Sequence, residues 1–216
     1  MLKIDGENGQ ILPLLISGKT SSGKENKAKK SLGSKKKLDY ENYMKIDNIT
    51  LIGMPGSGKS TIGKLLAKRL NFKFIDCDEY IERKEKMSLP QIIDSEGDGE
   101  FIKLEAKRIL ELLPLKKHVL APGGSIIYSK KLINTLRDSS FIIFLNMPLK
   151  VLAKRLTRQR ARRINWFGSK SIKELYNERF PFYKKYADFT INYSRKSNSE
   201  IVNEIIKKWF EKEIML

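Results

Sequence analysis

The sequence is poor in the residues that cross-link chains or bind transition metals. Its 216 residues include one cysteine, Cys77, and one histidine, His118. A single cysteine excludes a disulfide within the chain, and such sparse use is typical of reducing compartments. No apolar run approaches the ~18 residues that a membrane-spanning helix needs, because the apolar stretch 11–16 is short and contains Pro13. We therefore expect a cytoplasmic protein that does not cross a membrane.

Acidic residues are also few. The chain has 25 Asp and Glu against 43 Lys and Arg, which gives a formal net charge of +18. Such an excess fits a nucleic-acid-binding protein or an enzyme for anionic substrates. The lysines are spread over helix faces, where they usually form a solvated surface, so we expect no nucleic-acid partner. With 40% hydrophobic residues, a chain of this length favours one folded domain, and we expect a monomer.

The first 44 residues differ from the rest in composition. Residues 24–37 are rich in Lys, Ser, Gly and Asn, and Leu32 is almost the only apolar residue among them. Such a segment buries too little apolar surface to offset its chain entropy. We predict a basic, disordered extension over 1–44 and a folded domain over 45–216, with Met44 as a possible alternative start.

The most informative motif lies at residues 49–70. Ile49–Ile52 is a short aliphatic run typical of a buried strand, and residues 62–70 have helical apolar spacing. Between them, Gly53–Ser60 reads GMPGSGKS and fits G-x-x-x-x-G-K-[ST]. A glycine turn that precedes a helix by chance is the alternative, but strand, loop and helix together indicate a site for a nucleoside triphosphate.

The residue types of this loop suit phosphate chemistry. Glycines let backbone N–H groups point at phosphate oxygens, and the helix N-terminus adds partial positive charge. Lys59 is expected to reach the β- and γ-phosphates, and the Ser60 hydroxyl to bind Mg²⁺. The predicted nucleotide-binding residues of the loop are Gly53, Gly56, Ser57, Gly58, Lys59, Ser60 and Thr61.

Two further segments place polar or glycine residues at strand ends. Asp76 and Asp78 follow the expected strand 73–76, and their spacing puts both carboxylates on one side if the chain stays extended. One is expected to serve the metal and the other the substrate, although a helix N-cap is an alternative. Residues 122–125 read PGGS after the strand 117–121, and a plain turn is the alternative to a substrate-binding loop. His118 starts that strand and is expected to be structural.

The order of elements predicts an α/β fold. Strands expected at 49–52, 73–76, 117–121, 141–145 and 189–192 alternate with helices, which favours a three-layer sandwich around a parallel sheet of five strands. Residues 158–163 carry four arginines, and we predict a short lid over about 158–170 that closes on triphosphate charge. Arginines next to Trp166 could instead stack on nucleic-acid bases.

From about residue 46 to residue 209 the chain resembles the shikimate kinase family. The resemblance rests on Gly53–Ser60, on Asp76-Cys77-Asp78, on the helix from Gly97 through Phe101 to Glu105, on residues 122–124 and on the RFPFY segment at 179–183. It implies a P-loop kinase that uses ATP and Mg²⁺ to phosphorylate a small hydroxylated, anionic metabolite, with shikimate as the leading acceptor. Another hydroxy acid, a polyol or a nucleoside is the alternative acceptor, and a degenerate ATP-binding member is the non-enzymatic alternative.

The same resemblance implies roles for individual residues. Asp76 would serve Mg²⁺ with Ser60, and Asp78 would bind the acceptor hydroxyls. Arg155 would pack on adenine and Arg163 would be the lid arginine. Gly123, Gly124 and Arg179 would complete the acceptor site, with Arg179 on a carboxylate.

Two positions depart from the family pattern. Ile102 stands where the family has a second carboxylate-binding arginine, and Pro122 stands at the first glycine of the glycine loop. Proline has no N–H to donate, and the neighbouring Lys103 points about 100° away from position 102 on a helix. These departures predict an intact phosphate-donor half and an altered acceptor half.

Overall fold

The computed structural model describes residues 2–4, 11–13, 48–156, 171–193 and 196–215. Internal contacts divide the chain into two units, Met1–Tyr43 and Met44–Leu216. In the first unit, β1 (Leu2–Ile4) pairs with β2 (Ile11–Pro13) in an antiparallel ladder that opposes Leu2 to Pro13. This pair was not anticipated. Residues 24–37 lie outside the described residues, so the disorder of the extension remains a prediction.

The second unit is built on a parallel sheet. Its strands are β3 (Asn48–Ile52), β4 (Lys73–Asp76), β5 (His118–Ala121), β6 (Ser140–Asn146) and β7 (Phe189–Asn192). They lie in the order β4-β5-β3-β6-β7, and every neighbouring pair is parallel. The central strand β3 therefore has β5 on one side and β6 on the other. The strand order reverses at β3, which makes it the switch point of the sheet. In open parallel sheets, ligands bind outside the carboxyl ends of the strands at this point.

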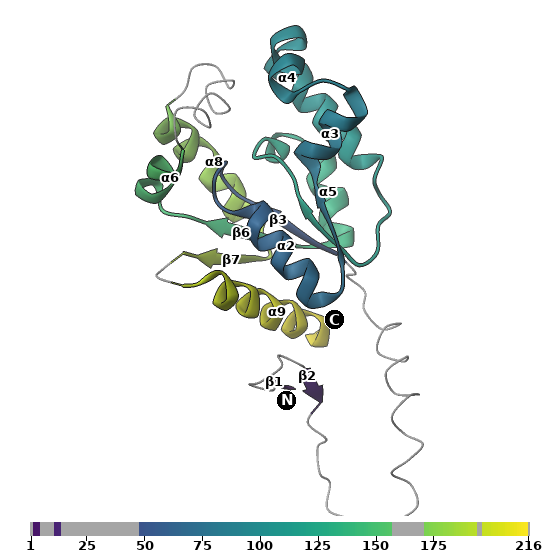
Figure 1. Ribbon diagram of the computed structural model, residues 1–216, viewed down its shortest axis with the longest axis vertical. Coiled ribbons are helices and arrows are strands. Elements are labelled where there is room, and N and C mark those ends of the chain that lie inside the picture. Colours follow the sequence, from purple (N-terminus) through teal and green to yellow (C-terminus); the bar gives the residue numbers. More distant parts are fainter. Residues whose placement is uncertain (1, 5–10, 14–47, 157–170, 194–195, 216) are drawn as a thin grey trace, which may run out of the picture. The chain divides into compact units, whose positions relative to one another are not determined.

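Helices cover both faces of this sheet, as Figure 1 shows. On one face α2 (Lys59–Leu70) lies beside α9 (Asn198–Met215). On the other face α5 (Lys130–Ser139) and α8 (Ile172–Tyr186) pack on β6. The other helical elements among the described residues are α3 (Cys77–Glu85), α4 (Leu89–Leu110), the 3₁₀ turn η1 (Ile126–Tyr128) and α6 (Leu149–Arg155). The predicted three-layer fold is confirmed.

The burial of the central strand β3 on both faces explains why its sequence is nearly continuously apolar. All five residues of β3 are buried, which is usual for a parallel strand covered on both faces. Its two polar residues, Asn48 and Thr50, are satisfied across the sheet, and the Thr50 hydroxyl shares a hydrogen bond of 2.6 Å with the Ser140 hydroxyl. Asn48 donates to the carbonyls of Leu115 at 2.6 Å and Ser139 at 3.0 Å, and accepts from the His118 N–H at 3.1 Å. Asn48 thus ties the segments that begin β3, β5 and β6, and His118 has the structural place expected of it.

The helices between β4 and β5 differ from the sequence prediction. Sequence spacing suggests a helix over 79–93 that is broken near Leu89-Pro90, a turn at 97–99 and a second helix over 100–113. In the structure the break falls earlier, since Lys86 adopts a left-handed conformation and Ser88 begins α4 with a capping box to Gln91. Pro90 lies in the first turn of α4, where its missing N–H costs nothing. The expected turn is a kink inside α4 at Gly97, with φ of 81°.

Within the described residues, no helix is both long and apolar enough to cross a membrane.

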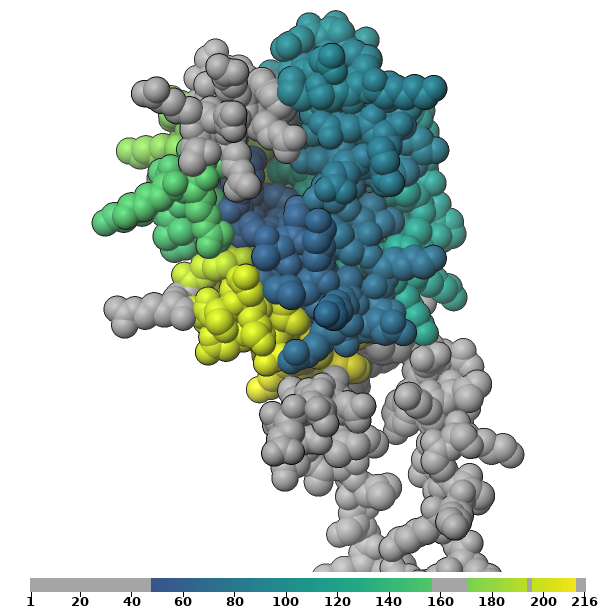
Figure 2. Space-filling model, viewed as in Figure 1, coloured from purple at the N-terminus to yellow at the C-terminus, as the bar shows by residue number. Residues whose placement is uncertain are grey.

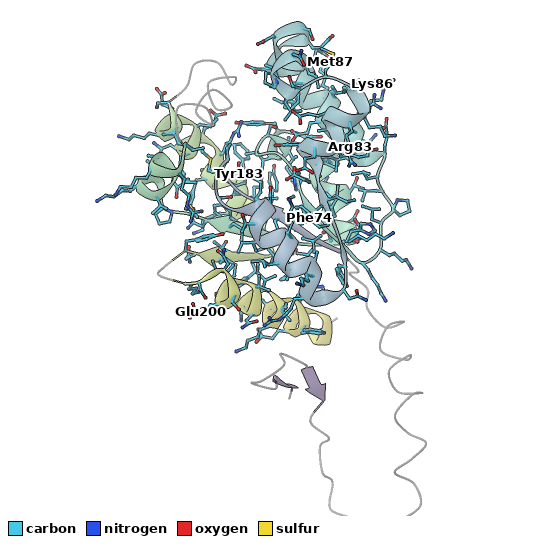
Figure 3. All side chains as sticks on the ribbon, viewed as in Figure 1. Phe74, Arg83, Lys86, Met87, Tyr183 and Glu200 are labelled. Carbon is cyan, nitrogen blue, oxygen red and sulfur yellow. The ribbon has the colours of Figure 1, made fainter. Side chains whose placement is uncertain are left out.

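Replacing Gly63 with Ala is expected to destabilise the fold although alanine favours helices. Gly63 is buried on α2, and a Cβ there would lie 2.3 Å from Cε2 of Phe74 in the edge strand β4. Phe74 is labelled in Figure 3. The overpacking should lower the free energy of unfolding by about 1–3 kcal/mol. Urea denaturation measures it, with Gly99→Ala as the control, because a Cβ on Gly99 meets nothing within 4 Å. Equal stability of the two variants would contradict the prediction.

Candidate active site

A cavity of about 860 Å³ opens at the carboxyl end of the sheet. Segments that follow each of the five strands line it: the phosphate loop after β3, Asp76 and Asp78 at the end of β4, residues 121–125 after β5, Arg155 after β6 and Tyr193 after β7. In Figure 2 the surface of α2 (blue) lies between the teal surface of α3 and α4 and the yellow surface of α9. The cavity occupies the switch point that parallel sheet topology predicts.

The phosphate loop turns tightly between β3 and α2. Gly58 precedes α2 with φ of 95°, in the left-handed region that favours glycine, and no side chain caps the helix. Lys59 lies across the loop, and its Nζ donates to the carbonyls of Gly53 at 3.0 Å and Met54 at 3.3 Å. Burial lowers the pKa of Lys59, and the charges of Asp78 and Asp76 oppose that shift. The ammonium thus lies at the loop with two carboxylates nearby.

Most of the predicted loop residues face the cavity, but two do not. Gly56, Gly58, Lys59, Ser60 and Thr61 line it, whereas Gly53 and Ser57 are absent from its wall. Ser57 is fully buried, and its N–H donates to the Met54 carbonyl at 3.1 Å. Ser57 therefore closes the turn of the loop instead of facing the cavity.

A hydroxyl and a carboxylate meet beside the loop. The Ser60 hydroxyl donates to Oδ2 of Asp76 at 2.6 Å. Mg²⁺ is usually held by one or two protein oxygens together with waters and phosphate oxygens, and this pair fits that donor set. No group of three or more His, Cys, Asp or Glu side chains forms a metal site elsewhere in the described part of the chain.

Asp78 reaches the cavity from a helix instead of from an extended segment. Asp76 is the N-cap of α3, and its Oδ1 accepts the N–H of Asp78 at 3.2 Å. Asp78 thus lies in the first helical turn, so the extended geometry assumed from the sequence was wrong. The N-cap alternative placed the cap at Asp78, whereas the structure has it two residues earlier, at Asp76. Both carboxylates still line the cavity, because a helix turn at the strand end keeps them together.

The acceptor side of the cavity is tightly packed around two glycines. A Cβ on Gly123 would lie 2.3 Å from Oε1 of Glu105 and 3.1 Å from Oδ1 of Asp78. A Cβ on Gly124 would lie 2.7 Å from Nη1 of Arg179. Only glycine leaves room there for these three charged groups, which come from α3, α4 and α8.

Arg179 is fully buried on α8, and the hydroxyls of Tyr128 and Tyr183 lie beside its guanidinium. Its Nε donates to the hydroxyl of Tyr128 at 3.2 Å, and that hydroxyl donates to Glu178 at 2.6 Å. Tyr183, labelled in Figure 3, donates to the Gly124 carbonyl at 2.8 Å. A guanidinium supported in this way is preorganised for a carboxylate or phosphate group.

Glu105 is a cavity residue that sequence reasoning did not select. Its side chain is 1% exposed, it accepts a short hydrogen bond from the Ser125 hydroxyl, and its Oε1 has no hydrogen-bond partner among the described residues. Burial raises the pKa of Glu105 to about 7, the Ser125 hydrogen bond opposes the shift, and the Asp78 charge adds to it. Glu105 does belong to the helix segment from Gly97 to Glu105 that carries the family resemblance. An acidic residue on the buried face of that helix was the sequence feature that could have identified it.

Of the other positions singled out in the sequence, some line the cavity and some do not. Arg155, the last residue of α6, lines the cavity, whereas Ile102 is half-buried and absent from its wall. Pro122 lines the cavity at the end of β5. Arg163 and the lid over 158–170 lie outside the described residues.

Stability should fall with rising pH because of Glu105. Its pKa of about 7 in the folded protein exceeds the ordinary value of 4.5. Between these pH values the folded state holds a proton that the unfolded chain has released. The free energy of unfolding should therefore decrease by about 3 kcal/mol as pH rises through this window. Urea denaturation at pH 5 and pH 8 measures the change.

The matched variants are Glu105→Gln and Glu100→Gln on the same helix. Glu105→Gln should remove this component of the pH dependence, and Glu100→Gln, at an exposed site beside Lys103, should retain it. An unchanged pH dependence in Glu105→Gln would refute the assignment.

A phosphate loop at the centre of a five-stranded parallel sheet, with carboxylates and an arginine facing its lysine, is the architecture of a P-loop kinase. Comparison with known proteins identifies which kind. The family model described as shikimate kinase matches residues 55–209. The chain belongs to the shikimate kinase family, whose members are phosphotransferases that act on a hydroxyl group.

Individual relatives agree with this assignment. The chain is 36% identical to a shikimate kinase from Caldanaerobacter subterraneus over 166 residues, which cover 76% of this chain and 96% of that protein. The structure of an Acinetobacter baumannii shikimate kinase in complex with shikimate is similar, with a TM-score of 0.71, 28% identity and coverage of 80% of this chain and 97% of that one. A shikimate kinase from Aquifex aeolicus has a TM-score of 0.64 at 31% identity, over 77% of this chain and 98% of that one.

Proposed function

We propose that this chain transfers the γ-phosphoryl group of ATP to a hydroxyl of shikimate and forms shikimate 3-phosphate. The observation that carries the proposal is the convergence of Lys59, Asp78 and Arg179 on one cavity of about 860 Å³. Donor-side and acceptor-side groups that line a single cavity suit direct transfer between two bound substrates. We expect the protein to act as a cytoplasmic monomer.

The donor half is assigned to the phosphate loop. Lys59 and the N–H groups at the start of α2 bind the phosphates and stabilise the charge that develops on the transferred group. Ser60 and Asp76 hold Mg²⁺, which neutralises the phosphate oxygens when it is bound. Arg155 packs on the adenine base, and Arg163 brings further positive charge from the lid.

The acceptor half is assigned to Asp78, the glycine loop and Arg179, which line the same cavity. Asp78 orients the acceptor hydroxyl and takes its proton as the phosphoryl group transfers. The backbone of Gly123 and Gly124 approaches the acceptor closely because neither residue has a Cβ. Arg179 binds the carboxylate of the acceptor through its planar fork.

Ile102 favours a second candidate, a kinase of the same class for another hydroxy acid, a polyol or a nucleoside. The family resemblance places an arginine there, and its absence removes a charge-assisted contact of about 1.5–3 kcal/mol. Pro122 removes one N–H donor from the glycine loop as well. Both positions belong to the acceptor half in the family pattern, Pro122 on the cavity wall and Ile102 outside it, and neither change touches the donor half.

The decisive experiment measures ADP formation by the full chain with ATP and Mg²⁺, with and without shikimate. We expect turnover that depends on shikimate, and a product with one added phosphate by mass spectrometry. Lys59→Met serves as the control for contaminating kinases and should lose the activity. Equal ADP formation with and without shikimate would refute shikimate as the acceptor, and a panel of hydroxy acids, polyols and nucleosides would then test the second candidate.

A further inference from the structure

Tyr193 lies where the chain leaves β7 and reaches the nucleotide side of the cavity. Its N–H donates to the Asn146 carbonyl at 3.1 Å, which holds the residue at the carboxyl end of the sheet. Its side chain lines the cavity, and its hydroxyl is buried without a hydrogen-bond partner in the part of the chain that the structure describes. Nearly all buried hydroxyls are hydrogen-bonded, so this one indicates a partner that arrives with a ligand.

The position of this hydroxyl identifies the chemistry of that partner. It lies 3.0 Å from the point that a Cβ on Gly58 would occupy, directly beside the start of α2. Nη1 of Arg155 lies 3.8 Å from the same point. The N-terminus of a helix attracts phosphate, and the Tyr193 hydroxyl adds a donor there while the guanidinium of Arg155 adds positive charge nearby. The surroundings of the hydroxyl therefore suit an anionic oxygen.

The protonation state of Tyr193 fits a donor. Burial raises the pKa of Tyr193 to about 12, and the Arg155 charge opposes that shift. The phenol is therefore neutral near pH 7 and keeps its proton for a hydrogen bond. A hydrogen bond to a charged oxygen is stronger than one between neutral groups, so this contact should contribute measurably to affinity.

We infer that Tyr193 is a nucleotide-binding residue whose hydroxyl donates a hydrogen bond to a phosphate oxygen of the bound nucleoside diphosphate or triphosphate. The inference deepens the proposed function and rests on it, since it concerns nucleotide binding at the same cavity. It also gives a second reason for glycine at position 58, because any side chain there would contact this hydroxyl.

The test compares the full-length protein with Tyr193→Phe by isothermal titration with ADP and, separately, with tripolyphosphate. Loss of a hydrogen bond to a charged group should weaken both ligands by about 10–100-fold. The thermal midpoint without ligand should stay unchanged or rise, because the variant removes a hydroxyl that has no partner among the described residues. Tyr186→Phe, a tyrosine on α8 outside the cavity wall, is the matched control and should change neither affinity nor stability.

The outcomes separate this inference from the proposed reaction, because no acceptor is present in the titration. Unchanged ADP affinity in Tyr193→Phe would overturn the inference. So would weaker ADP binding with unchanged tripolyphosphate binding, since the hydroxyl would then face the nucleoside. A wild-type protein that binds ADP but fails to phosphorylate shikimate would refute only the acceptor. A wild-type protein that binds neither ligand would refute both proposals.

Discussion

Replacing Asp78 with Asn should lower kcat for shikimate phosphorylation by about 10²–10⁴-fold. The Asp78 carboxylate faces the glycine loop, since its Oδ1 lies 3.1 Å from the point where a Cβ on Gly123 would be. Its charge also acts on Lys59, whose pKa it raises against the effect of burial. Asparagine keeps the size of the side chain but cannot accept a proton from the hydroxyl. The chemical step should therefore suffer while the cavity keeps its shape.

Steady-state kinetics with both substrates varied measure this effect. The KM for ATP should change little, because Lys59, Ser60 and Asp76 stay in place. Asp94→Asn, at an exposed position on α4, is the control and should retain wild-type kcat. A kcat for Asp78→Asn within a factor of about three of wild type would exclude Asp78 as the base, since general-base catalysis contributes far more than that.

The fold could be predicted from sequence because each strand and helix carries its own local pattern. The apolar run of β6 and the strand–loop–helix around Lys59 need no distant partner to be interpreted. The start of α4 was misplaced because Pro90 suits both a helix break and a first helical turn. The capping box between Ser88 and Gln91 distinguishes them, and its Ser-x-x-Gln spacing was a sequence signal that the prediction did not use.

The donor half of the site could be predicted from a contiguous motif, whereas the individual roles of the acceptor residues Asp78, Gly123, Gly124 and Arg179 followed only from the family resemblance. The phosphate loop is contiguous in sequence, so its residues are recognisable together. The acceptor wall is assembled from separate elements, and a pair such as Glu105 with Ser125 joins residues 20 positions apart in sequence. Tyr193 illustrates the same limit, since nothing in its neighbours along the chain indicates that its hydroxyl lies beside Gly58. Local sequence patterns do not indicate which side chains come together at the carboxyl end of the sheet.

Changing Arg179 to Lys should raise the KM for shikimate by about 10–100-fold, which corresponds to the loss of a charge-assisted hydrogen bond. Arg179 is fully buried and its Nε is already held by Tyr128, so the guanidinium plane is fixed toward Gly124. Lysine keeps the charge but lacks the planar fork that binds a carboxylate through two parallel hydrogen bonds. Ile102 supplies no second cation. The other arginine of the described cavity wall, Arg155, is assigned to the nucleotide, so it should not compensate for the loss at position 179.

The kinetic signature distinguishes this role from a structural one. If Arg179 binds the carboxylate of shikimate, its replacement should raise the KM for shikimate. The KM for ATP should stay within about twofold, because the variant weakens binding of the acceptor only. Arg137→Lys, at an exposed position near the end of α5, is the control and should change neither constant. Thermal unfolding of both variants shows whether the protein remains folded. If both KM values rise together, or if the KM for shikimate does not change, Arg179 supports the cavity wall and does not bind the acceptor.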